Sequence, residues 1–452
     1  MSPLNCFKAY DIRGKVPDDL DEDLAYRIGQ AFTAQFLPKK IAIGHDIRLS
    51  GPGLSQALTK GFMDAGVDVI DLGLCGTEEI YFASFHLEVD GGIIVTASHN
   101  PAEYNGMKFV RKGAVPVSGD TGLKKIEELA TQGKTVKAEQ PGSFSSYDIK
   151  TDYMGHLLDY VDIAGLSPLK LVVNCGNGCA GPIIDLLETF LPFHFIRLQH
   201  EPDGTFPNGV PNPLLPENRE ITARAVRENQ ADLGIAWDGD FDRCFFFDEN
   251  GGFIEGYYIV GLLAQTMLKK SPGAKIIHDP RLIWNTRELV ERAGGTPVLC
   301  KTGHAFIKER MRAEDAVYGG EMSAHHYFRD FSYCDSGMIP WLIVAEMLCH
   351  SKQKMSTFVS DMMAAYPVSG EINSRVNDPD AVMDRIESAF TDSCLEKDFT
   401  DGLSMSFAGY RFNVRKSNTE PVLRLNVETR ANPSLLQEKT DQLLAMIRSA
   451  DI

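Results

Sequence analysis

The sequence has no CxxC pair, and its nine cysteines are scattered singly along 452 residues. An odd, dispersed set excludes a disulfide framework or a zinc cluster and predicts inert, buried thiols in a reducing compartment. Long apolar runs are also missing, since the strongest, 338–345, contains Pro340 and is followed by Glu346. Such a run is too short to span a bilayer, and the first residues lack the apolar stretch of a signal peptide. We therefore expect a cytoplasmic protein with no membrane partner.

Positively charged residues are fewer than negatively charged ones. Lys and Arg number 45 against 62 Asp and Glu, which gives a formal net charge of −17. A duplex-binding protein needs a basic footprint, so a nucleic-acid partner is not expected. A small phosphorylated metabolite remains compatible, because a few converging cations are enough to bind it. The composition is 43% hydrophobic and 24% charged, as in soluble globular proteins, and the length predicts roughly three domains.

Three stretches of the chain share one order of predicted elements, namely an apolar strand, a helical segment and a second strand. They cover residues 41–72, 169–198 and 275–301. Each continues to a further apolar strand that ends in a polar loop; these strands are 90–95, 231–236 and 316–320. The alternation predicts βαβ units with parallel strands. Because ligands bind at the carboxyl ends of such strands, the loops predict one active site between three related domains.

The remainder, from about Pro367, alternates strands and helices without this plan and is predicted to be a smaller α+β domain. The predicted fold class is therefore α/β, with three related βαβ-type mixed-sheet domains and a C-terminal α+β domain around a central cleft. Linkers are expected at 142–146 and near Gly251. The predicted domains are 1–145, 146–252, 253–366 and 367–452.

Three aspartates, Asp238, Asp240 and Asp242, fall within five residues of the second loop. Their mutual repulsion favours a bound cation, and hard carboxylate oxygens suit Mg²⁺ or Ca²⁺. An EF-hand is rejected, because Arg243 stands where that loop needs glycine and the flanks are predicted strands. The alternative is a solvated acidic turn.

The first loop contains Ser98, followed by His99, Asn100 and Pro101. A serine here is either a nucleophile or phosphoryl carrier, or an ordinary turn-forming residue. No G-x-S-x-G surrounds it, so a hydrolase elbow is excluded. Lys108 is either a nearby cation or a surface lysine.

A literal G-x-G-x-x-G occurs at 176–181, with Glu201 about twenty residues later, as in a dinucleotide fingerprint. Pro182 directly after it, and the absence of the pattern in the two sister turns, favour a tight strand-to-helix turn instead. Nicotinamide binding stays as the alternative.

Two further polar loops carry candidate binding groups. Glu321, Ser323, His325 and His326 suit sugar hydroxyls, and the histidines lack a further metal ligand at suitable spacing. A second group combines a cation with small hydrogen-bonding side chains, which suits phosphate or an ordinary turn; its members are Arg415, Ser417, Asn418 and Thr419. Arg13 is uninformative alone.

Together these loops resemble those of the α-D-phosphohexomutase superfamily. The motif sequences are most similar to those of the bacterial phosphomannomutases. Five motifs follow the family's order over nearly the whole chain: Tyr10-Asp-Ile-Arg-Gly14, Thr96-Ala-Ser-His-Asn-Pro101, Asp238-Gly-Asp-Phe-Asp-Arg243, Gly320-Glu-Met-Ser-Ala-His325 and Arg415-Lys-Ser-Asn-Thr-Glu420. Ala324 replaces a glycine common in the superfamily, which affects the expected loop geometry but not the expected reaction.

The resemblance implies an isomerase that interconverts mannose 6-phosphate and mannose 1-phosphate through a phosphoserine and a hexose 1,6-bisphosphate, which also serves as activator. It implies Mg²⁺ held by Ser98, Asp238, Asp240 and Asp242. The implied catalytic residues are Ser98, Lys108, Arg13, Arg243 and His304. The implied substrate-binding residues are Glu321, Ser323, His325, Arg415, Ser417, Asn418 and Thr419.

The resemblance also implies a hexose phosphate as the small-molecule partner and a role in supplying GDP-mannose for polysaccharide synthesis. A monomer or a homodimer is expected. Phosphoglucomutase activity or dual specificity is the near alternative. Two alternatives from other classes are an NAD-dependent oxidoreductase built on 176–181 and a noncatalytic, metal-binding sensor of phosphosugars.

Overall fold

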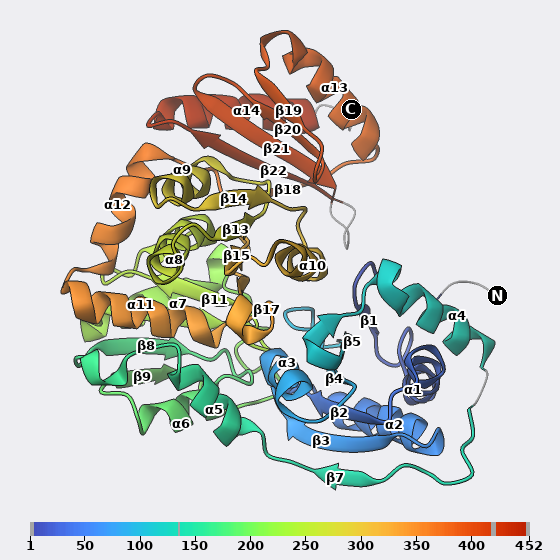
Figure 1. Cartoon of the computed structure of the whole chain (residues 1–452). Helices are drawn as coiled ribbons and strands as arrows, with labels where there is room; N and C mark the ends of the chain where they lie inside the picture. Colours follow the sequence, from blue (N-terminus) through green and yellow to red (C-terminus); the bar gives the residue numbers. More distant parts are fainter. Residues whose placement is uncertain (1–3, 134–135, 417–421, 449–452) are drawn as a thin grey trace. The chain divides into compact units, whose positions relative to one another are not determined.

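The computed structural model describes residues 4–133, 136–416 and 422–448 (Figure 1). The chain forms two compact units. The first comprises Met1–Phe253 and His325–Gln353, and the second comprises Ile254–Ala324 and Lys354–Ile452. Within the described ranges, no helix has the length and apolar character needed to cross a membrane.

The first sheet lies in the first unit and has seven strands. Its order is β1-β5-β4-β2-β3-β7, with β6 paired to β5. The central pairs β2–β3 and β2–β4 are parallel, and β4–β5 is antiparallel, so the sheet is mixed. Its strands are β1 (Ile12–Lys15), β2 (Lys40–His45), β3 (Asp68–Leu74), β4 (Gly91–Val95), β5 (Tyr104–Arg111), β6 (Val115–Pro116) and β7 (Phe144–Ser146).

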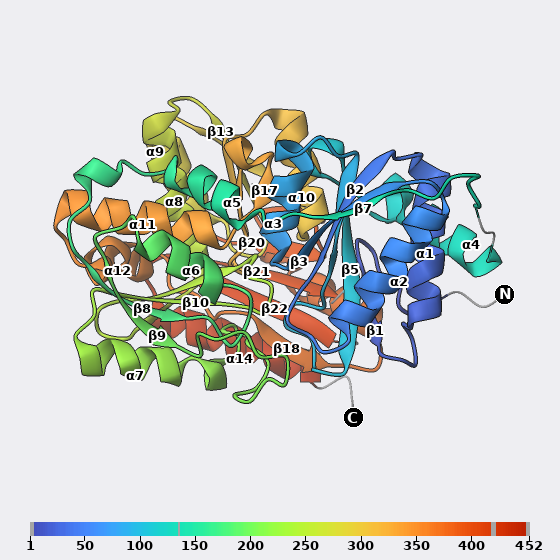
Figure 2. The same ribbon diagram turned by 90° about the horizontal axis from the view of Figure 1, so that it is seen from below.

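Helices α1 (Glu22–Phe36) and α2 (Gly51–Asp64) lie side by side against this sheet (Figure 2). Each carries an apolar stripe at i, i+4 and i+8, which faces the core; the stripes are Leu24, Ile28, Phe32 and Leu54, Leu58, Phe62. Burying each of these side chains contributes about 1.5–3 kcal/mol. Gly61 lets the helices approach closely, because a Cβ there would lie 2.3 Å from the Tyr26 carbonyl oxygen. Helices α3 (Thr77–His86) and α4 (Lys124–Gln132) complete this part of the unit.

The second sheet, also in the first unit, has the order β12-β11-β10-β8-β9. Its strands are β8 (Lys170–Asn174), β9 (His194–Leu198), β10 (Leu233–Trp237), β11 (Cys244–Phe247) and β12 (Phe253–Ile254). Its helices are α5 (Lys150–Leu158), α6 (Gly181–Glu188) and α7 (Glu220–Asn229). The segment 325–353 returns to this unit with β16 (His326–Phe328), β17 (Cys334–Asp335) and α11 (Met338–Ser351). Trp341 of α11 packs edge-on against Phe193 and Phe195.

The second unit contains parallel strands β13 (Lys275–His278), β14 (Thr296–Leu299) and β15 (Tyr318–Gly320). Helices α8 (Gly256–Lys270), α9 (Trp284–Arg292), α10 (His304–Glu314) and α12 (Met355–Ala365) accompany them. An antiparallel sheet follows in the order β18-β22-β21-β20-β19. Its strands are β18 (Ile372–Arg375), β19 (Glu396–Asp398), β20 (Leu403–Ser406), β21 (Tyr410–Lys416) and β22 (Val422–Thr429).

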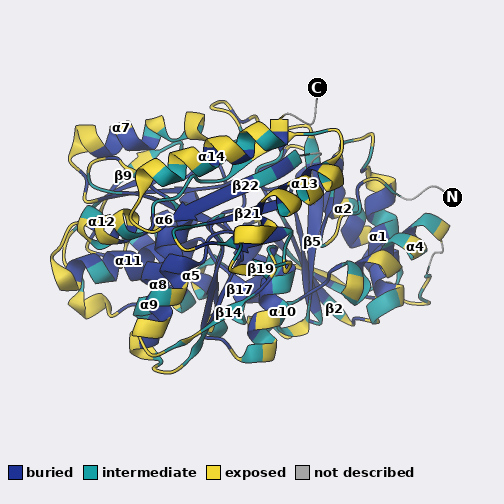
Figure 3. Ribbon diagram, turned by 90° about the horizontal axis from the view of Figure 1, so that it is seen from above, coloured by how far each residue is buried: buried dark blue, intermediate teal, exposed yellow. Residues whose placement is uncertain are grey.

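Helices α13 (Pro379–Phe390) and α14 (Pro433–Arg448) cover one face of that antiparallel sheet. Leu443 and Ile447 of α14 point into its core, while the outer side of the helix is exposed (Figure 3). This is the α+β arrangement predicted for the C-terminal part.

The predicted repeat is confirmed strand by strand. In each copy the first strand lies between the other two: β2 between β4 and β3, β8 between β10 and β9, and β13 between β15 and β14. Because all three strands of a copy are parallel, the polar loops after β4, β10 and β15 leave equivalent strand ends.

Both predicted linker segments make defined contacts in the structure. Residues 144–146 form β7, which pairs in parallel with β3. Gly142 also packs tightly, since a Cβ there would lie 1.9 Å from the Val67 carbonyl oxygen. Gly251 belongs to a tight turn between β11 and β12, with a φ of 76° and its N–H donating to the Asp248 carbonyl. Glycine here provides a left-handed turn rather than flexibility between domains.

Candidate active site

Ser98 lies in the loop after β4 and has an unusual backbone conformation. Its φ is +49°, in the left-handed region, which costs a non-glycine residue about 1–2 kcal/mol. The side chain is 3% exposed. Its Oγ donates to Asp238 Oδ2 at 2.7 Å and lies 3.0 Å from His99 Nδ1. The residue is therefore a buried hydroxyl aimed at the acidic loop after β10.

The acidic loop brings three buried carboxylates together. Asp238, Asp240 and Asp242 are at most 1% exposed, and one oxygen from each lies within 4.8 Å of the others. The solvated-turn alternative is therefore wrong for these residues. Among the described residues, the Oδ1 atoms of all three aspartates have no hydrogen-bond partner. Buried carboxylate oxygens without partners are costly, and a hard divalent cation would satisfy them.

Two cations neutralise part of this cluster. Lys108, on β5 opposite Ile94 of β4, places its Nζ 2.7 Å from Asp240 Oδ2 and 2.5 Å from Asp242 Oδ2. It is 5% exposed, so the surface-lysine alternative is wrong: the antiparallel β4–β5 pair turns it toward the acidic loop. Arg243 donates from Nε to Asp238 Oδ2 at 2.8 Å, and its Nη2 lies 2.5 Å from His99 Nδ1.

The charges make the aspartates unequal. Burial opposes ionisation of Asp240, but the Lys108 ammonium outweighs it and lowers the pKa of that carboxyl. For Asp242, burial and the Asp240 charge together raise the pKa to about 6. Burial also lowers the pKa of His99, and the Arg243 charge acts in the same direction. The imidazole of His99 is therefore neutral near pH 7.

Arg13, on β1, reaches the same loop from another side. Its Nε donates to Asp11 Oδ2 at 2.7 Å, and its Nη1 donates to the Ala97 carbonyl at 3.2 Å and to the Asn100 side-chain oxygen. Although burial opposes the charge, the Asp11 carboxylate raises the pKa of this guanidinium. Arg13 therefore stays charged beside Ser98.

The loop after β15 is divided between the two units. His325 belongs to the first unit, where its Nδ1 lies 3.0 Å from Asp335 Oδ2 and 4.0 Å from Asp242 Oδ1. Asp242, His325 and Asp335 can together hold a metal ion. The expectation that no further ligand joins the histidine is therefore wrong, because folding supplies partners that are distant in sequence.

In the second unit, Glu321 and Ser323 are arranged around Arg281. Glu321 Oε1 accepts from the Gly303 N–H at 3.0 Å and lies 3.6 Å from Arg281 Nη2. Ser323 Oγ accepts from the same Nη2 at 3.2 Å. His304 begins α10 one residue after Gly303, and its Nδ1 is 3.5 Å from Lys308 Nζ. Glu321 is thus hydrogen-bonded to the backbone of Gly303, the residue directly before His304.

Arg415, at the end of β21, belongs to a cluster of three arginines around one carboxylate. Its Nη2 donates to Glu371 Oε2 at 3.1 Å. Arg281 lies 3.4 Å from the same oxygen, and Arg424 donates to Oε1 at 2.9 Å. Burial opposes the charge on Glu371, but the three guanidiniums outweigh it and lower the pKa of that carboxyl. The predicted partners Ser417, Asn418 and Thr419 lie outside the described residues.

The glycines at 176–181 allow other parts of the protein's own backbone to approach closely. A Cβ at Gly178 would lie 2.7 Å from the Gly239 carbonyl oxygen, and one at Gly181 would lie 2.2 Å from the His200 carbonyl oxygen. The segment connects β8 to α6 as a tight turn, which agrees with the strand-to-helix turn favoured by the sequence. The nine thiols are unpaired as predicted; eight are buried and Cys394 is partly exposed.

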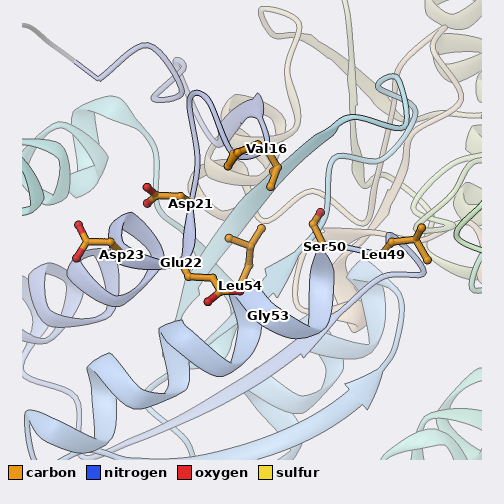
Figure 4. A pocket seen from close by; sticks show the side chains of 9 residues that line it. Val16, Asp21, Glu22, Asp23, Leu49, Ser50, Gly53 and Leu54 are labelled. Atoms are coloured by element: carbon orange, nitrogen blue, oxygen red, sulfur yellow. The ribbon is translucent and has the colours of Figure 1, made fainter.

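A separate cavity of about 410 Å³ opens in the first unit beside the N-termini of α1 and α2 (Figure 4). Asp21, Glu22 and Asp23 line it together with Leu49 and Leu54. Asp21 is also the N-cap of α1, accepting from the Leu24 N–H at 2.7 Å. No residue of the predicted site lines this cavity.

Several residues that contact the predicted groups were missed by the sequence reasoning; they are Asp46, Arg48, Thr77, His99, Arg281, Asp335, Glu371 and Arg424. Thr77, for example, donates from Oγ1 to Asp240 Oδ2 at 2.5 Å. One signal was available: the first strand of two repeats ends in Asp-x-Arg, at 46–48 and 279–281. The other residues stand alone in the sequence and have no comparable pattern.

Three repeated βαβ sheets with polar loops at equivalent strand ends, followed by an α+β domain, define the class of multidomain α/β enzymes to which the mutases of phosphorylated sugars belong. The family models for phosphoglucomutase/phosphomannomutase alpha/beta/alpha domains I, II and III match residues 4–137, 151–252 and 255–366. The C-terminal domain model of the same family matches residues 371–445. The chain belongs to this family, so the predicted resemblance is confirmed, as are the three mixed-sheet α/β domains and the C-terminal domain of the predicted fold class.

Relatives and a solved structure agree with this assignment. A phosphomannomutase of Salmonella typhimurium is 60% identical over 454 residues, which cover 99% of this chain and all of the relative. A protein of Xanthomonas campestris named for phosphohexose mutases is 58% identical over 445 residues, covering 98% of this chain and 99% of the relative. A crystal structure of a phosphoglucomutase/phosphomannomutase family protein from Burkholderia thailandensis has a TM-score of 0.90 at 32% identity, covering 100% of this chain and 98% of that one.

The chain is therefore an enzyme, an isomerase of the phosphohexomutase type. This assignment contradicts both alternatives from other classes, the NAD-dependent oxidoreductase and the noncatalytic sensor.

Proposed function

We propose that this enzyme is a phosphomannomutase that interconverts mannose 6-phosphate and mannose 1-phosphate, with Ser98 as the phosphoryl carrier. The observation that carries the proposal is the buried Ser98 hydroxyl, 2.7 Å from one of three clustered aspartates. Relatives named phosphomannomutase that span the full chain support mannose as the sugar. The product would supply GDP-mannose for polysaccharide synthesis, and we place the enzyme in the cytoplasm.

Mg²⁺ fits the residues present. Asp238, Asp240 and Asp242 each offer a buried oxygen without a partner among the described residues, and Ser98 would add an oxygen to the same set. Hard oxygen donors of this number suit Mg²⁺. When bound, Mg²⁺ would supply Lewis-acid neutralisation of the charge on the transferring phosphoryl group.

The chain's own groups would perform the transfer. A hydroxyl oxygen of the hexose monophosphate attacks the phosphorus of phosphoserine 98; the new P–O bond forms as the bond to Oγ breaks. The attacking hydroxyl gives up its proton, which His304 assists, and a proton returns to Ser98 Oγ when the hydroxyl is regenerated. Lys108, Arg13 and Arg243 stabilise the charge around the reacting group.

The resulting hexose 1,6-bisphosphate reorients and returns its other phosphoryl group to Ser98. Bisphosphate from solution acts as activator, because it phosphorylates Ser98 in enzyme that has lost the group. Glu321, Ser323 and His325 would bind the sugar hydroxyls. Arg415, together with residues 417–419, would bind the phosphate that is not reacting, because guanidinium groups match phosphate geometry.

We further propose four domains, at 1–145, 146–252, 253–366 and 367–452. The ranges matched by the four family models support this division. Ser98, the three aspartates, Lys108, Arg13 and Arg243 then belong to the first two domains. His304 and the substrate-binding groups belong to the last two.

Dual specificity for mannose and glucose phosphates is the second candidate, favoured by the relative named for phosphohexose mutases. The two candidates are separated by a coupled assay with Mg²⁺ and catalytic hexose 1,6-bisphosphate. It compares kcat/KM for mannose 1-phosphate, glucose 1-phosphate and glucosamine 1-phosphate. Strong preference for mannose 1-phosphate supports the first proposal, equal use of glucose 1-phosphate supports the second, and no turnover of either contradicts both.

The carrier role has its own test. Ser98→Ala should abolish turnover and prevent ³²P from labelled glucose 1,6-bisphosphate from appearing on the protein. Wild-type turnover by Ser98→Ala at saturating bisphosphate would disprove the assignment. Arg219→Lys is a control that lies outside the proposed site and should keep both properties.

A further inference from the structure

The backbone of Ser98 is held on both sides through one carboxylate, Asp46. Asp46 Oδ2 accepts from Thr96 Oγ1 at 2.6 Å, and that hydroxyl accepts from the Ser98 N–H at 2.9 Å. Asp46 Oδ1 accepts from the Arg48 N–H at 2.9 Å, and Oδ2 lies 3.4 Å from Arg48 Nε. Arg48 Nη2 in turn donates to the Ser98 carbonyl at 2.9 Å. The N–H and the carbonyl of Ser98 are thus tied to the same anchor.

Arg48 also fixes the loop after Ser98. Its two terminal nitrogens donate to the carbonyls of Asn100 (2.6 Å), Pro101 (2.8 Å) and Tyr104 (2.7 Å), in addition to that of Ser98. Three carbonyls of this loop and that of Tyr104, the first residue of β5, converge on a side chain that is 1% exposed. A guanidinium is the side-chain cation with enough donors in a fixed plane for such a set.

The conformation held in this way is a strained one. Ser98 has a φ of +49°, and its carbonyl is also packed against Gly239, where a Cβ would lie 2.9 Å from the Ser98 oxygen. A non-glycine residue stays in the left-handed region only when its surroundings over-determine it. The loop bonds to Arg48 and the Thr96 relay provide that constraint, and the Ser98 side chain consequently points to Asp238.

The same device occurs in the third repeat. Asp279 Oδ1 accepts from the Arg281 N–H at 2.9 Å, and Asp279 Oδ2 accepts from the Met322 N–H at 2.8 Å. Arg281 Nη2 then donates to Ser323 Oγ. In both repeats an Asp-x-Arg turn after the first strand therefore holds the polar loop after the third strand.

We propose that Arg48, anchored by Asp46, is a positioning residue that sets the backbone of the Ser98 loop so that Oγ is presented for phosphoryl transfer. The proposal rests on the proposed function, since it requires Ser98 to be the phosphoryl carrier. Arg48 does not touch the reacting atoms; it acts through the four carbonyls.

The test uses the full-length enzyme phosphorylated on Ser98, with the variants Arg48→Ala and Arg48→Lys. Displacing a reacting group by about 1 Å costs about 100-fold in rate, so Arg48→Ala should lower kcat by about 100-fold. The KM for mannose 1-phosphate should change less than threefold, because substrate-binding groups are untouched. Arg48→Lys, which keeps the charge but loses most carbonyl bonds, should lose about tenfold. Millimolar guanidinium chloride should partly restore Arg48→Ala.

Arg219→Lys is the matched control. Arg219 also donates to two carbonyls, those of Pro213 and Leu214, at 3.0 and 2.7 Å, but none belongs to the Ser98 loop. Its kcat should match the wild type. A second readout is the phosphorus NMR signal of phosphoserine 98, which should shift and broaden in the Arg48 variants and stay unchanged in Arg219→Lys.

Each outcome decides between the alternatives. If Arg48→Ala fails to fold, Arg48→Lys and Thr96→Val, which breaks the relay to the Ser98 N–H, decide by the same kcat and NMR readouts. Folded variants of Arg48 with a wild-type kcat and an unchanged phosphoserine signal would overturn the proposal. An active Ser98→Ala would instead overturn the carrier role, whatever the Arg48 variants do.

Discussion

Replacing Lys108 by methionine removes a buried cation while keeping a side chain of similar length. The Lys108 ammonium contacts two carboxylates, at 2.7 and 2.5 Å, and all three side chains are at most 5% exposed. Removing one partner of a buried ion pair costs about 3–5 kcal/mol, because the other charge is left uncompensated. Here two carboxylates lose the same partner, so we expect the upper end of that range. At about 2–3 °C per kcal/mol, the melting temperature should fall on the order of 10 °C.

A divalent cation should recover about half of that loss. A ligand present at about 100 times its Kd stabilises the folded form by about 2.7 kcal/mol. The methionine variant should gain more from Mg²⁺ than the wild type, since Lys108 no longer repels the ion. Melting is therefore measured at pH 8 in EDTA and in Mg²⁺. At pH 5 the deficit should shrink, because burial already raises the pKa of Asp242 to about 6 and a proton can replace the missing charge.

Lys150→Met provides the control for Lys108→Met. Lys150 is also partly buried, and it lies 3.7 Å from Glu79 and from Asp148, but it does not contact the acidic loop. The melting temperature of Lys150→Met should rise with Mg²⁺ no more than the melting temperature of the wild type does. Equal stability of Lys108→Met and wild type in EDTA, or equal gains from Mg²⁺, would refute the electrostatic account of this site.

Three further predictions concern separate parts of the chain. Burial raises the pKa of Glu79 to about 7 from 4.5, so the folded form binds the extra proton and the free energy of unfolding falls as pH rises through that window. Between pH 5 and pH 8 the wild type should therefore lose about 3 kcal/mol more of its unfolding free energy than Glu79→Gln does, measured by urea unfolding. Ala324→Gly should stabilise the protein by about 1 kcal/mol in the same assay, because Ala324 has a φ of +70°. Arg415→Ala should raise KM for mannose 1-phosphate at least tenfold in the coupled assay, with unchanged Mg²⁺ affinity; an unchanged KM would contradict the phosphate-binding role.

Much of the fold was predictable because a repeat leaves a periodic trace. Apolar strands followed by polar loops recur three times, and the structure places those loops at equivalent strand ends. The local structure of the linker segments was not predictable in this way. Glycine and serine at 142–146 indicate a linker by composition but do not show that three of these residues form β7 beside β3.

The candidate site was predictable only where several polar residues stand together. Ser98 and Asp238 are marked by their own loops, although 140 positions separate them. Lys108 and Asp335 are single residues whose partners are supplied by folding, so the sequence offers no local sign of their contacts. Burial, not composition, distinguishes Lys108 from a surface lysine.

The turn after the first strand has features that are common to the three repeats and one that differs. In all three repeats the side chain of the first turn residue accepts from the N–H two positions later: Asp46 from Arg48, Asn174 from Gly176 and Asp279 from Arg281. The backbone frame is therefore common, while the third position differs. Where it is arginine, its guanidinium holds the neighbouring polar loop; where it is Gly176, with a φ of +60°, the chain instead turns tightly toward α6. The same turn thus serves two uses, and the residue at its third position distinguishes them.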